Sequence, residues 1–141
     1  MSTPHFLTSA LAHPEDHGIH IERTGAVLVQ RLEMAGDSTT RRKGLLGRDA
    51  LDQDVGFVIA PTQGVHTFGM RFPIDIVGVA RDGRVVKVRG EVPPGRLVFA
   101  FRAFAILELA AGMARRAAIS VGDRLIVVAN QHQADPPRFT R

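Results

Sequence analysis

The sequence predicts a mainly β fold of the α+β class: a small antiparallel β-barrel or curled sheet with one or two short helices. Short apolar runs of strand length recur along the chain, and glycine, proline and aspartate separate them. These strands do not alternate with long amphipathic helices, as βαβ units would require. Of the 141 residues, 45% are apolar and 23% are charged, which suits one compact domain with its own core.

Flexible tails are expected at residues 1–20 and 131–141, around a single domain at residues 21–130. The first tail contains four of the six histidines: His5, His13, His17 and His20. A histidine-rich tract can bind a metal, but we favour a solvated terminus because no apolar run nearby would hold the ligands in place. The segment also lacks the basic and apolar regions of a secretory signal. We therefore expect a cytoplasmic protein.

The first half of the domain contains two expected strands and one expected helix. Ala26–Val29 begins the first strand. Ser38–Thr40 offers helix N-cap residues, so a short helix is expected over Arg41–Leu46. Gly56–Ala60 is a continuous apolar run typical of a buried strand, and Pro61 ends it.

The clearest local signal is a β-hairpin around Asp82-Gly83. This dipeptide separates two β-prone runs, Ile74–Ala80 and Arg84–Arg89. A two-residue turn of this kind needs positive φ at both positions, which Asp-Gly tolerates. We therefore predict a two-residue hairpin turn here.

The second half is ambiguous over Leu97–Ala111. Its alanines favour one amphipathic helix and its phenylalanines favour two strands, so periodicity leaves both arrangements open. A short helical turn is expected at Met113–Ala118, and an Ile/Val-rich strand at Arg124–Ala129.

Six segments, in this order, resemble the DUF192 family, also called UPF0127. They are Arg41–Leu46, Gly56–Ile59, Thr67–Val77, Asp82–Val86, Ile106–Gly112 and Gly122-Asp123. The resemblance covers about residues 39–128 and implies a compact, largely β fold. It brings no established reaction, because the family is named for having no known function.

Asp75 lies inside an apolar run and, in a strand, shares a face with Val77 and Val79. A carboxylate there needs a partner. It is either a site carboxylate paired with Arg71 or His66, or a structural group that holds backbone N–H groups or an arginine. We expect these three side chains to come within reach of one another.

Glu108 poses the same question between Leu107 and Leu109. Two carboxylates with different pKa values could act as general acid and base, but they could equally clamp arginines. Metal catalysis would have to use His66, Asp75, Glu108 and Asp123, and their spacing matches no ligand pattern. The chain also lacks Walker A, G-x-S-x-G, H-E-x-x-H and dinucleotide motifs. We therefore expect neither a metal nor a cofactor.

The charge of +4 and the pI of 10.9 suggest an anionic partner, but the detail argues against nucleic acid. Sixteen of the eighteen basic residues are scattered arginines, Tyr and Trp are absent, and the eight phenylalanines lie mostly in apolar runs. The absence of cysteine excludes disulfides and thiolate sites, and no apolar run is long enough to span a membrane. The sequence carries no signal for an oligomeric state.

Two functions remain open. The first is a small β-rich ligand-binding or accessory module with a pocket near Thr67–Asp75, for a small-molecule ligand. The alternative is a hydrolase or isomerase that uses Asp75, Glu108 and His66 as acid/base groups, so whether the protein is an enzyme stays undecided. The candidate ligand-binding residues are His66, Phe68, Met70, Arg71, Asp75 and Glu108.

Overall fold

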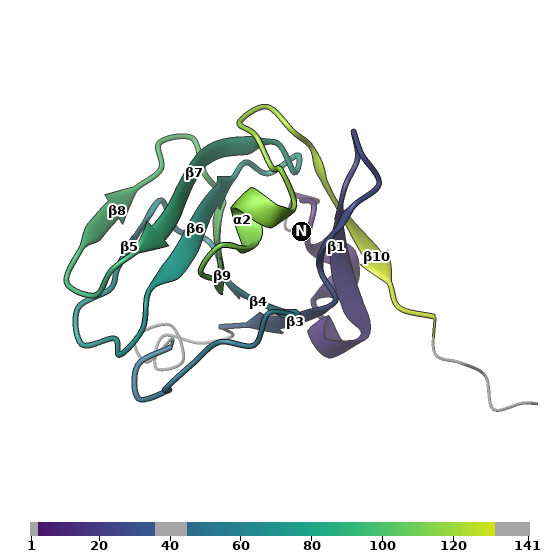
Figure 1. Cartoon of the computed structure of the whole chain (residues 1–141). Helices are drawn as coiled ribbons and strands as arrows, with labels where there is room; N and C mark the ends of the chain where they lie inside the picture. Colours follow the sequence, from purple (N-terminus) through teal and green to yellow (C-terminus); the bar gives the residue numbers. More distant parts are fainter. Residues whose placement is uncertain (1–2, 36–44, 132–141) are drawn as a thin grey trace, which may run out of the picture.

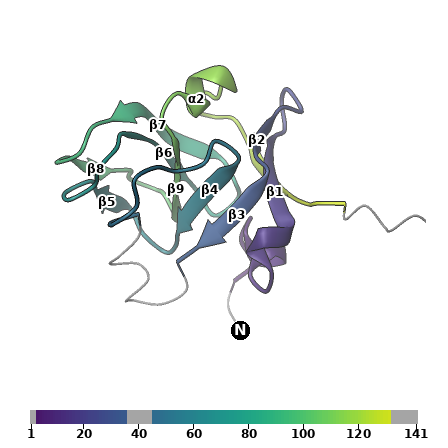
Figure 2. The ribbon, with the colours of Figure 1, turned by 60° about the horizontal axis from the view of Figure 1, so that its bottom comes forward.

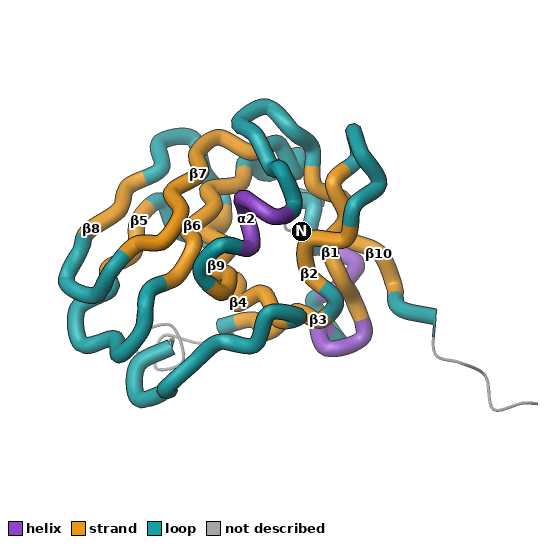
Figure 3. The backbone as a smooth tube through the Cα atoms, in the orientation of Figure 1, coloured by secondary structure: helices purple, strands orange, loops and turns teal. Residues whose placement is uncertain are grey.

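The computed structural model describes residues 3–35 and 45–131 of the chain, and its fold is mainly β (Figure 1). The strands are β1 (His17–Ile21), β2 (Val27–Val29), β3 (Arg31–Met34), β4 (Val55–Ile59), β5 (Gly64–His66), β6 (Ile74–Val79), β7 (Val85–Val92), β8 (Leu97–Phe99), β9 (Ala105–Ala110) and β10 (Leu125–Ala129). Within these described ranges, the helical segments are two 3-10 turns, η1 (Thr8–Ala10) and η2 (Pro14–Asp16), and one short α-helix, α2 (Met113–Arg116). Strand and loop therefore dominate the described chain (Figure 3). None of the described helices has the length and apolar character needed to cross a membrane.

The strands form three sheets in the described residues, and their pairing does not close into a barrel, which was one of the two expected arrangements. The largest sheet has the order β3-β4-β9-β6-β7, in which only the pair β3–β4 is parallel. A second sheet has the antiparallel order β10-β1-β2, and β5 pairs with β8 as a two-stranded ribbon.

The five-stranded sheet lies between the other two, with the β5–β8 ribbon on one side and the β10-β1-β2 sheet on the other (Figures 1 and 2). Two apolar clusters fill the spaces between these layers. The first cluster joins Val77 and Leu107 to Ile19 of β1, and the second joins Ile76 and Ile106 to Val98 of the ribbon. Strands β6 and β9 are consequently buried on both faces, which explains their nearly continuous apolar sequences.

Several sequence predictions are confirmed. All but the last residue of Gly56–Ala60 lies in β4, and all but the first residue of Arg124–Ala129 lies in β10. Met113–Ala118 begins with α2. The ambiguous stretch Leu97–Ala111 forms two strands, β8 and β9, and not a helix. The helix expected at Arg41–Leu46 lies mostly outside the described residues.

The hairpin at Asp82-Gly83 is present, but its turn differs from the prediction. The amide of Ala80 donates to the carbonyl of Arg84, and the amide of Gly83 donates to the carbonyl of Ala80. Only Gly83 has positive φ in this turn, at +91°. The loop therefore contains three residues and ends in a left-handed glycine, which is the next commonest hairpin geometry after the two-residue turn.

The prediction of a flexible segment at residues 1–20 is wrong for most of its length. Leu7 and Ala10 are fully buried in the first apolar cluster, and Phe6 packs against it. Residues His17–Ile21 form β1, the central strand of its sheet. The sequence argument failed because these few apolar residues, although scattered, all face the same core. Of the other predicted tail, residues 132–141 lie outside the described residues.

Candidate functional site

The two buried carboxylates, Asp75 and Glu108, lie on neighbouring strands but face opposite sides of the five-stranded sheet. In the β6–β9 register Asp75 is opposite Leu109, and Glu108 is opposite Ile76. Paired residues share a face, and successive residues alternate between faces. Their carboxyl groups therefore cannot converge on one cleft, as the two-carboxylate acid/base mechanism would require.

Asp75 is a fully buried carboxylate whose oxygens accept three backbone hydrogen bonds. Oδ1 accepts from the amides of Glu91 (2.7 Å) and Gly112 (3.1 Å), and Oδ2 accepts from the amide of Ala114 (2.8 Å). Glu91 and Gly112 both have positive φ, so their amides point away from the strand ladders. Asp75 thus joins an irregular part of β7 to the start of α2, which is the structural role considered from the sequence.

The expected grouping of Asp75 with Arg71 does not form. The Arg71 guanidinium donates to Asp49 Oδ1 at 2.9 Å, and both side chains are exposed. Asp75 faces the interior from a regular strand, and its acceptors are already satisfied by backbone amides. The carboxylate has therefore no need of a cation.

Glu108 is buried without any such partner. Its residue surface is 3% exposed, and within residues 3–35 and 45–131 its carboxyl group makes no hydrogen bond or ion pair. No fully enclosed side-chain oxygen in this part of the chain lacks a partner, so the Glu108 carboxyl group must keep a small contact with solvent. Burial raises the pKa of Glu108 from 4.5 to about 7.

The surroundings of Glu108 explain this shift. Its cross-strand neighbours are Phe57 and Ile76, and Ile106 precedes it on the same face of β9. All three are buried members of the second apolar cluster. These apolar neighbours disfavour the charged carboxylate, because they do not replace the water that solvates it in the unfolded chain.

A second glutamate on the same sheet face shows the contrasting arrangement. Glu33 of β3 lies opposite Phe57, and its carboxylate accepts a hydrogen bond from Arg48 at 2.8 Å. The Arg48 guanidinium also lies 5.7 Å from the centre of the Phe57 ring. Arg48 thus neutralises Glu33 at the sheet edge and leaves Glu108, two strands further in, without a counter-ion.

The motif around Met70 contributes to the same apolar cluster. Met70 is 8% exposed and packs in the second cluster, and Phe72 packs against it. Thr67, which the sequence analysis did not single out, fixes this segment: its hydroxyl donates to the carbonyl of Pro93 (2.7 Å) and accepts from the amide of Arg96 (2.9 Å). The sequence did not indicate that the Thr67 side chain is completely buried next to glycine-containing turns.

Apart from Arg71, which pairs with Asp49 on the surface, the predicted site residues fall into three groups. Met70 belongs to the second cluster, and Glu108 lies on the sheet face that this cluster covers. His66 and Phe68 lie outside it, where their rings stack at 5.6 Å on the exposed surface. Asp75 faces the opposite cluster, so one pocket containing all the predicted residues does not form.

Asp123, the fourth residue considered for a metal site, is also a structural carboxylate. It accepts two hydrogen bonds from Arg23 (2.7 and 3.0 Å) and one from the amide of Ser120. Arg23 and this amide lower the pKa of Asp123. In the described part of the chain, the metal-competent side chains within 4.8 Å of one another are instead His13, Glu15 and Asp16 near η2. None of the four candidates belongs to that group.

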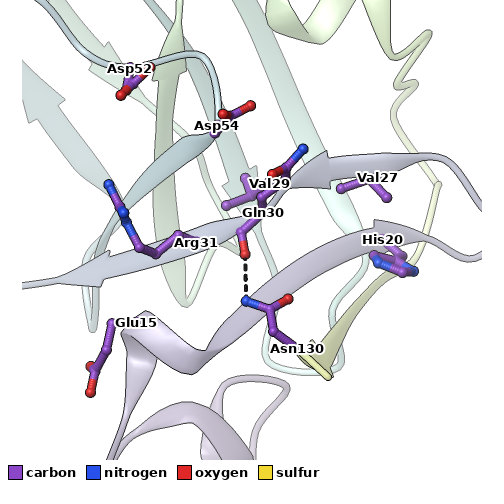
Figure 4. A pocket seen from close by; sticks show the side chains of 9 residues that line it. All are labelled: Glu15, His20, Val27, Val29, Gln30, Arg31, Asp52, Asp54 and Asn130. Atoms are coloured by element: carbon purple, nitrogen blue, oxygen red, sulfur yellow. Dashed lines mark hydrogen bonds between the residues drawn. The ribbon is translucent and has the colours of Figure 1, made fainter. Parts of the chain in front are cut away.

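Other hollows in the described surface contain mostly exposed side chains. The cavity in Figure 4 has a volume of about 420 Å³ and is lined by Glu15, His20, Val27, Val29, Gln30, Arg31, Asp52, Asp54 and Asn130. The side-chain amide of Asn130 closes one side of the cavity by donating to the backbone carbonyl of Gln30 at 2.9 Å. Its acidic groups are exposed to solvent, so the strongest chemical signal remains Glu108.

Comparisons with known proteins place the chain in a family. Residues 19–127 match the family model DUF192, described as an uncharacterised group of conserved proteins. The chain is similar to a protein of unknown function from Novosphingobium aromaticivorans, with 27% identity, a TM-score of 0.68, and coverage of 77% of this chain and 82% of that one. It is also similar to a "putative transcription regulator" from Sinorhizobium meliloti, with 23% identity, a TM-score of 0.68, and coverage of 77% and 89%. No curated protein matches. The matched segment makes up most of the sequence, and the chain belongs to the DUF192 family.

Proposed function

We propose that this protein is a small ligand-binding module and that Glu108 is the polar group of its binding site. The observation that carries the proposal is the burial of this carboxyl group with no partner among the described residues and only a small contact with solvent. Buried polar groups in proteins are almost always hydrogen-bonded, and an exception calls for an explanation. A ligand that supplies the missing hydrogen bond is the explanation we favour.

The surroundings of Glu108 define the class of ligand. Phe57, Ile76 and Met70 belong to one apolar cluster around it and offer contacts to a hydrocarbon body. The carboxyl group offers one strong polar contact, which favours a protonated amine or another hydrogen-bond donor. A few polar groups in an apolar setting are typical of small-molecule sites. We therefore propose a small amine with an apolar body as the ligand.

Binding of such a cation would depend on pH. Because the Glu108 pKa is about 7, the carboxyl group is mostly neutral at pH 6 and mostly ionised at pH 8.5. A protonated amine pairs with the ionised form only. Its affinity should rise across this interval, and binding should release a proton.

A thermal-shift screen with small primary amines that carry apolar groups tests the proposal. A ligand at about 100 times its Kd stabilises the native state by about 2.7 kcal/mol, which is about 5–10 °C in Tm for a chain of this length. We expect such a shift at pH 8.5 and a smaller one at pH 6. The matched variant Glu108→Gln keeps the shape but not the charge, so it should lose the pH-dependent part. A shift that is equal in both proteins, or no shift across the amine series, would reject the proposed site.

A hydrolase or isomerase that uses Glu108 is the second candidate, and one observation favours it. A carboxyl group with a pKa of about 7 suits general acid/base catalysis near neutral pH. The partners considered for this chemistry lie elsewhere, with Asp75 on the other face of the sheet and His66 on the outer surface. Chemical analysis of each stabilising compound after incubation separates the candidates, because only an enzyme would convert it.

A further inference from the structure

The outer face of the β5–β8 ribbon exposes a row of large apolar side chains. We call this row the aromatic ribbon; it consists of His66, Phe68, Leu97, Phe99 and Phe101. The exposed fractions are 50% for Phe68, 61% for Leu97, 57% for Phe99 and 81% for Phe101. In the register His66 lies opposite Leu97, and Gly64 lies opposite Phe99, so these positions share one face.

The exposed side chains do not attach the ribbon to the rest of the protein. Val98, between Leu97 and Phe99, is 4% exposed and packs in the second cluster, and Val65 packs against the same cluster. The ribbon thus attaches to the protein by its inner face alone. Exposed apolar patches of this kind often mark interaction sites.

The rings on the outer face are arranged for stacking. A Cβ atom added to Gly64 would come within 2.9 Å of the Phe99 ring. The absence of a side chain at Gly64 therefore lets this ring lie across the ribbon. The rings of His66 and Phe68 stack at 5.6 Å with 27° between their planes, and Phe101 is the most exposed large apolar residue described.

The charge around these rings is positive. The two segments that build the ribbon and its flanks, residues 62–73 and 93–104, contain no aspartate or glutamate. They contain Arg71, Arg96 and Arg102, and only Arg71 of these pairs with a carboxylate in the described structure. Lys87 of β7 adds its ammonium group, which donates to the Phe99 carbonyl at 2.6 Å. The aromatic ribbon therefore has cations on its borders and no acidic residue within its own segments.

We propose that the aromatic ribbon binds single-stranded nucleic acid. Unpaired bases would stack on Phe68, Phe99 and Phe101, while Arg96 and Arg102 contact the phosphates. Stacking on aromatic side chains combined with a positive surface is the usual basis of single-strand binding, and arginine suits phosphate geometry. The expectation against nucleic acid rested on scattered arginines, on the absence of Tyr and Trp, and on the position of the phenylalanines in apolar runs. The last of these reasons does not hold for Phe99, because the strand alternation turns it outward from such a run.

Other occupants fit these observations less well. A second copy of the chain would bring the arginines of one ribbon against those of the other. A membrane surface would favour apolar side chains gathered at one protruding tip. Here Phe68 follows the His66 end of the ribbon and Phe101 follows the opposite end, beyond Phe99. The rings are thus distributed along a track, as successive bases would require.

Fluorescence anisotropy with labelled twelve-nucleotide oligothymidylate and oligouridylate tests the proposal on the full chain. The wild type should bind both strands more tightly than a DNA duplex of equal length. Phe101→Ala should weaken binding about tenfold, the loss expected for one stacked base. Val121→Ala is the matched control, because Val121 is 64% exposed but lies outside the ribbon, and it should leave the affinity unchanged.

Charge variants provide an independent readout. Arg96→Gln and Arg102→Gln should each reduce the slope of log K against log salt by about 0.7, the value for one single-strand phosphate contact. Arg31→Gln removes the same charge from an exposed position on β3 and should leave this slope unchanged. Melting curves establish that each variant is folded.

Three outcomes would overturn the proposal. One is the absence of binding to either single strand at low salt. Another is equal weakening by the ribbon variants and their controls, which would mean unspecific charge attraction. The third is binding to phosphatidylserine vesicles, abolished by Phe101→Ala, without binding to oligonucleotides. Glu108 takes no part in any of these contacts. A failure of nucleic-acid binding would therefore not affect the proposal that Glu108 binds a small molecule.

Discussion

Asp75 and Glu108 show how two carboxyl groups with similar sequence surroundings acquire opposite properties. Both lie in apolar strands and both are buried. Asp75 accepts three backbone N–H groups, whereas Glu108 faces hydrocarbon. The difference arises from neighbours that are distant in the sequence, Gly112 for Asp75 and Phe57 for Glu108.

The raised pKa of Glu108 predicts that the stability of the protein falls as pH rises. Between pH 4.5 and 7 the folded state holds a proton on Glu108 that the unfolded state has lost, so the free energy of unfolding decreases across this interval. Glu108→Gln removes this dependence. The variant should match the wild type at pH 4 and exceed it by up to about 3 kcal/mol at pH 8. Urea unfolding at both pH values measures the difference, and an equal difference at both would contradict the raised pKa.

Asp75→Asn should destabilise the protein because an amide cannot replace both carboxylate oxygens. One of them would become an NH₂ group facing backbone donors. We expect a loss of about 2–4 kcal/mol in the free energy of unfolding. Asp49→Asn is the matched control, because Asp49 forms only an exposed ion pair with Arg71, and it should cost less than about 1 kcal/mol. Chemical denaturation of both variants measures the difference. Similar losses in the free energy of unfolding for the two variants would argue against the structural role of Asp75.

At the scale of elements, the hairpin turn between β6 and β7 also contacts the first residue of β10. The Gly83 carbonyl accepts from the amide of Leu125, and a Cβ atom at Gly83 would lie 2.5 Å from the Leu125 carbonyl oxygen. A side chain here would therefore meet both backbone strain and a steric clash. The turn is fixed by tertiary contact as well as by its own sequence.

This contact predicts unequal costs for two glycine substitutions. Gly83→Ala should lower the free energy of unfolding by about 2–4 kcal/mol, from strain and clash together. Gly25→Ala has a similar φ of +73° but open space around its Cβ position, so strain alone should cost about 1 kcal/mol. Thermal melts of both variants give the comparison. If the two losses were equal, the contact with Leu125 would contribute nothing.

The sequence was informative where local rules determine structure and silent where pairing between distant segments decides. Gly56–Ala60 formed the expected buried strand, and Asp82-Gly83 marked a hairpin. The number of residues in the turn was not predictable, because a glycine between two β-prone runs is compatible with two-residue and three-residue loops. Leu97–Ala111 could not be assigned from periodicity, since β9 is buried on both faces and shows no alternation.

The candidate site was predictable only in part. Glu108 and Met70 were both named as candidate ligand-binding residues. Met70 belongs to the second cluster, and Glu108 lies on the sheet face that this cluster covers. The grouping of Asp75 with Arg71 was wrong because nearness in sequence was taken as nearness of side chains. In a strand, four residues span about 13 Å, and each group found a partner elsewhere.

At the scale of the whole molecule, the N-terminal segment belongs to the core. Leu7→Ala should lower the free energy of unfolding by about 2–5 kcal/mol, because Leu7 is fully buried in the first cluster. Leu11→Ala removes the same atoms from a side chain that is 53% exposed, and it should change stability by less than about 0.5 kcal/mol. Denaturant titration of the two variants tests the correction to the flexible-tail prediction. Equal free energies of unfolding for the two variants would support the flexible-tail prediction instead.

The pairing of β1 with β10 has a consequence for how the protein can fold during synthesis. His17 lies opposite Ala129, so the central strand of the sheet can pair with β10 only after more than a hundred further residues have been synthesised. At roughly 5–20 residues per second, the ribosome needs about 5–20 s to make that partner. Until then β1 lacks one of its two neighbouring strands, and its apolar side chains, Ile19 among them, belong to an incomplete sheet. The nascent chain is thus exposed to chaperones and to aggregation until almost the entire domain has left the ribosome.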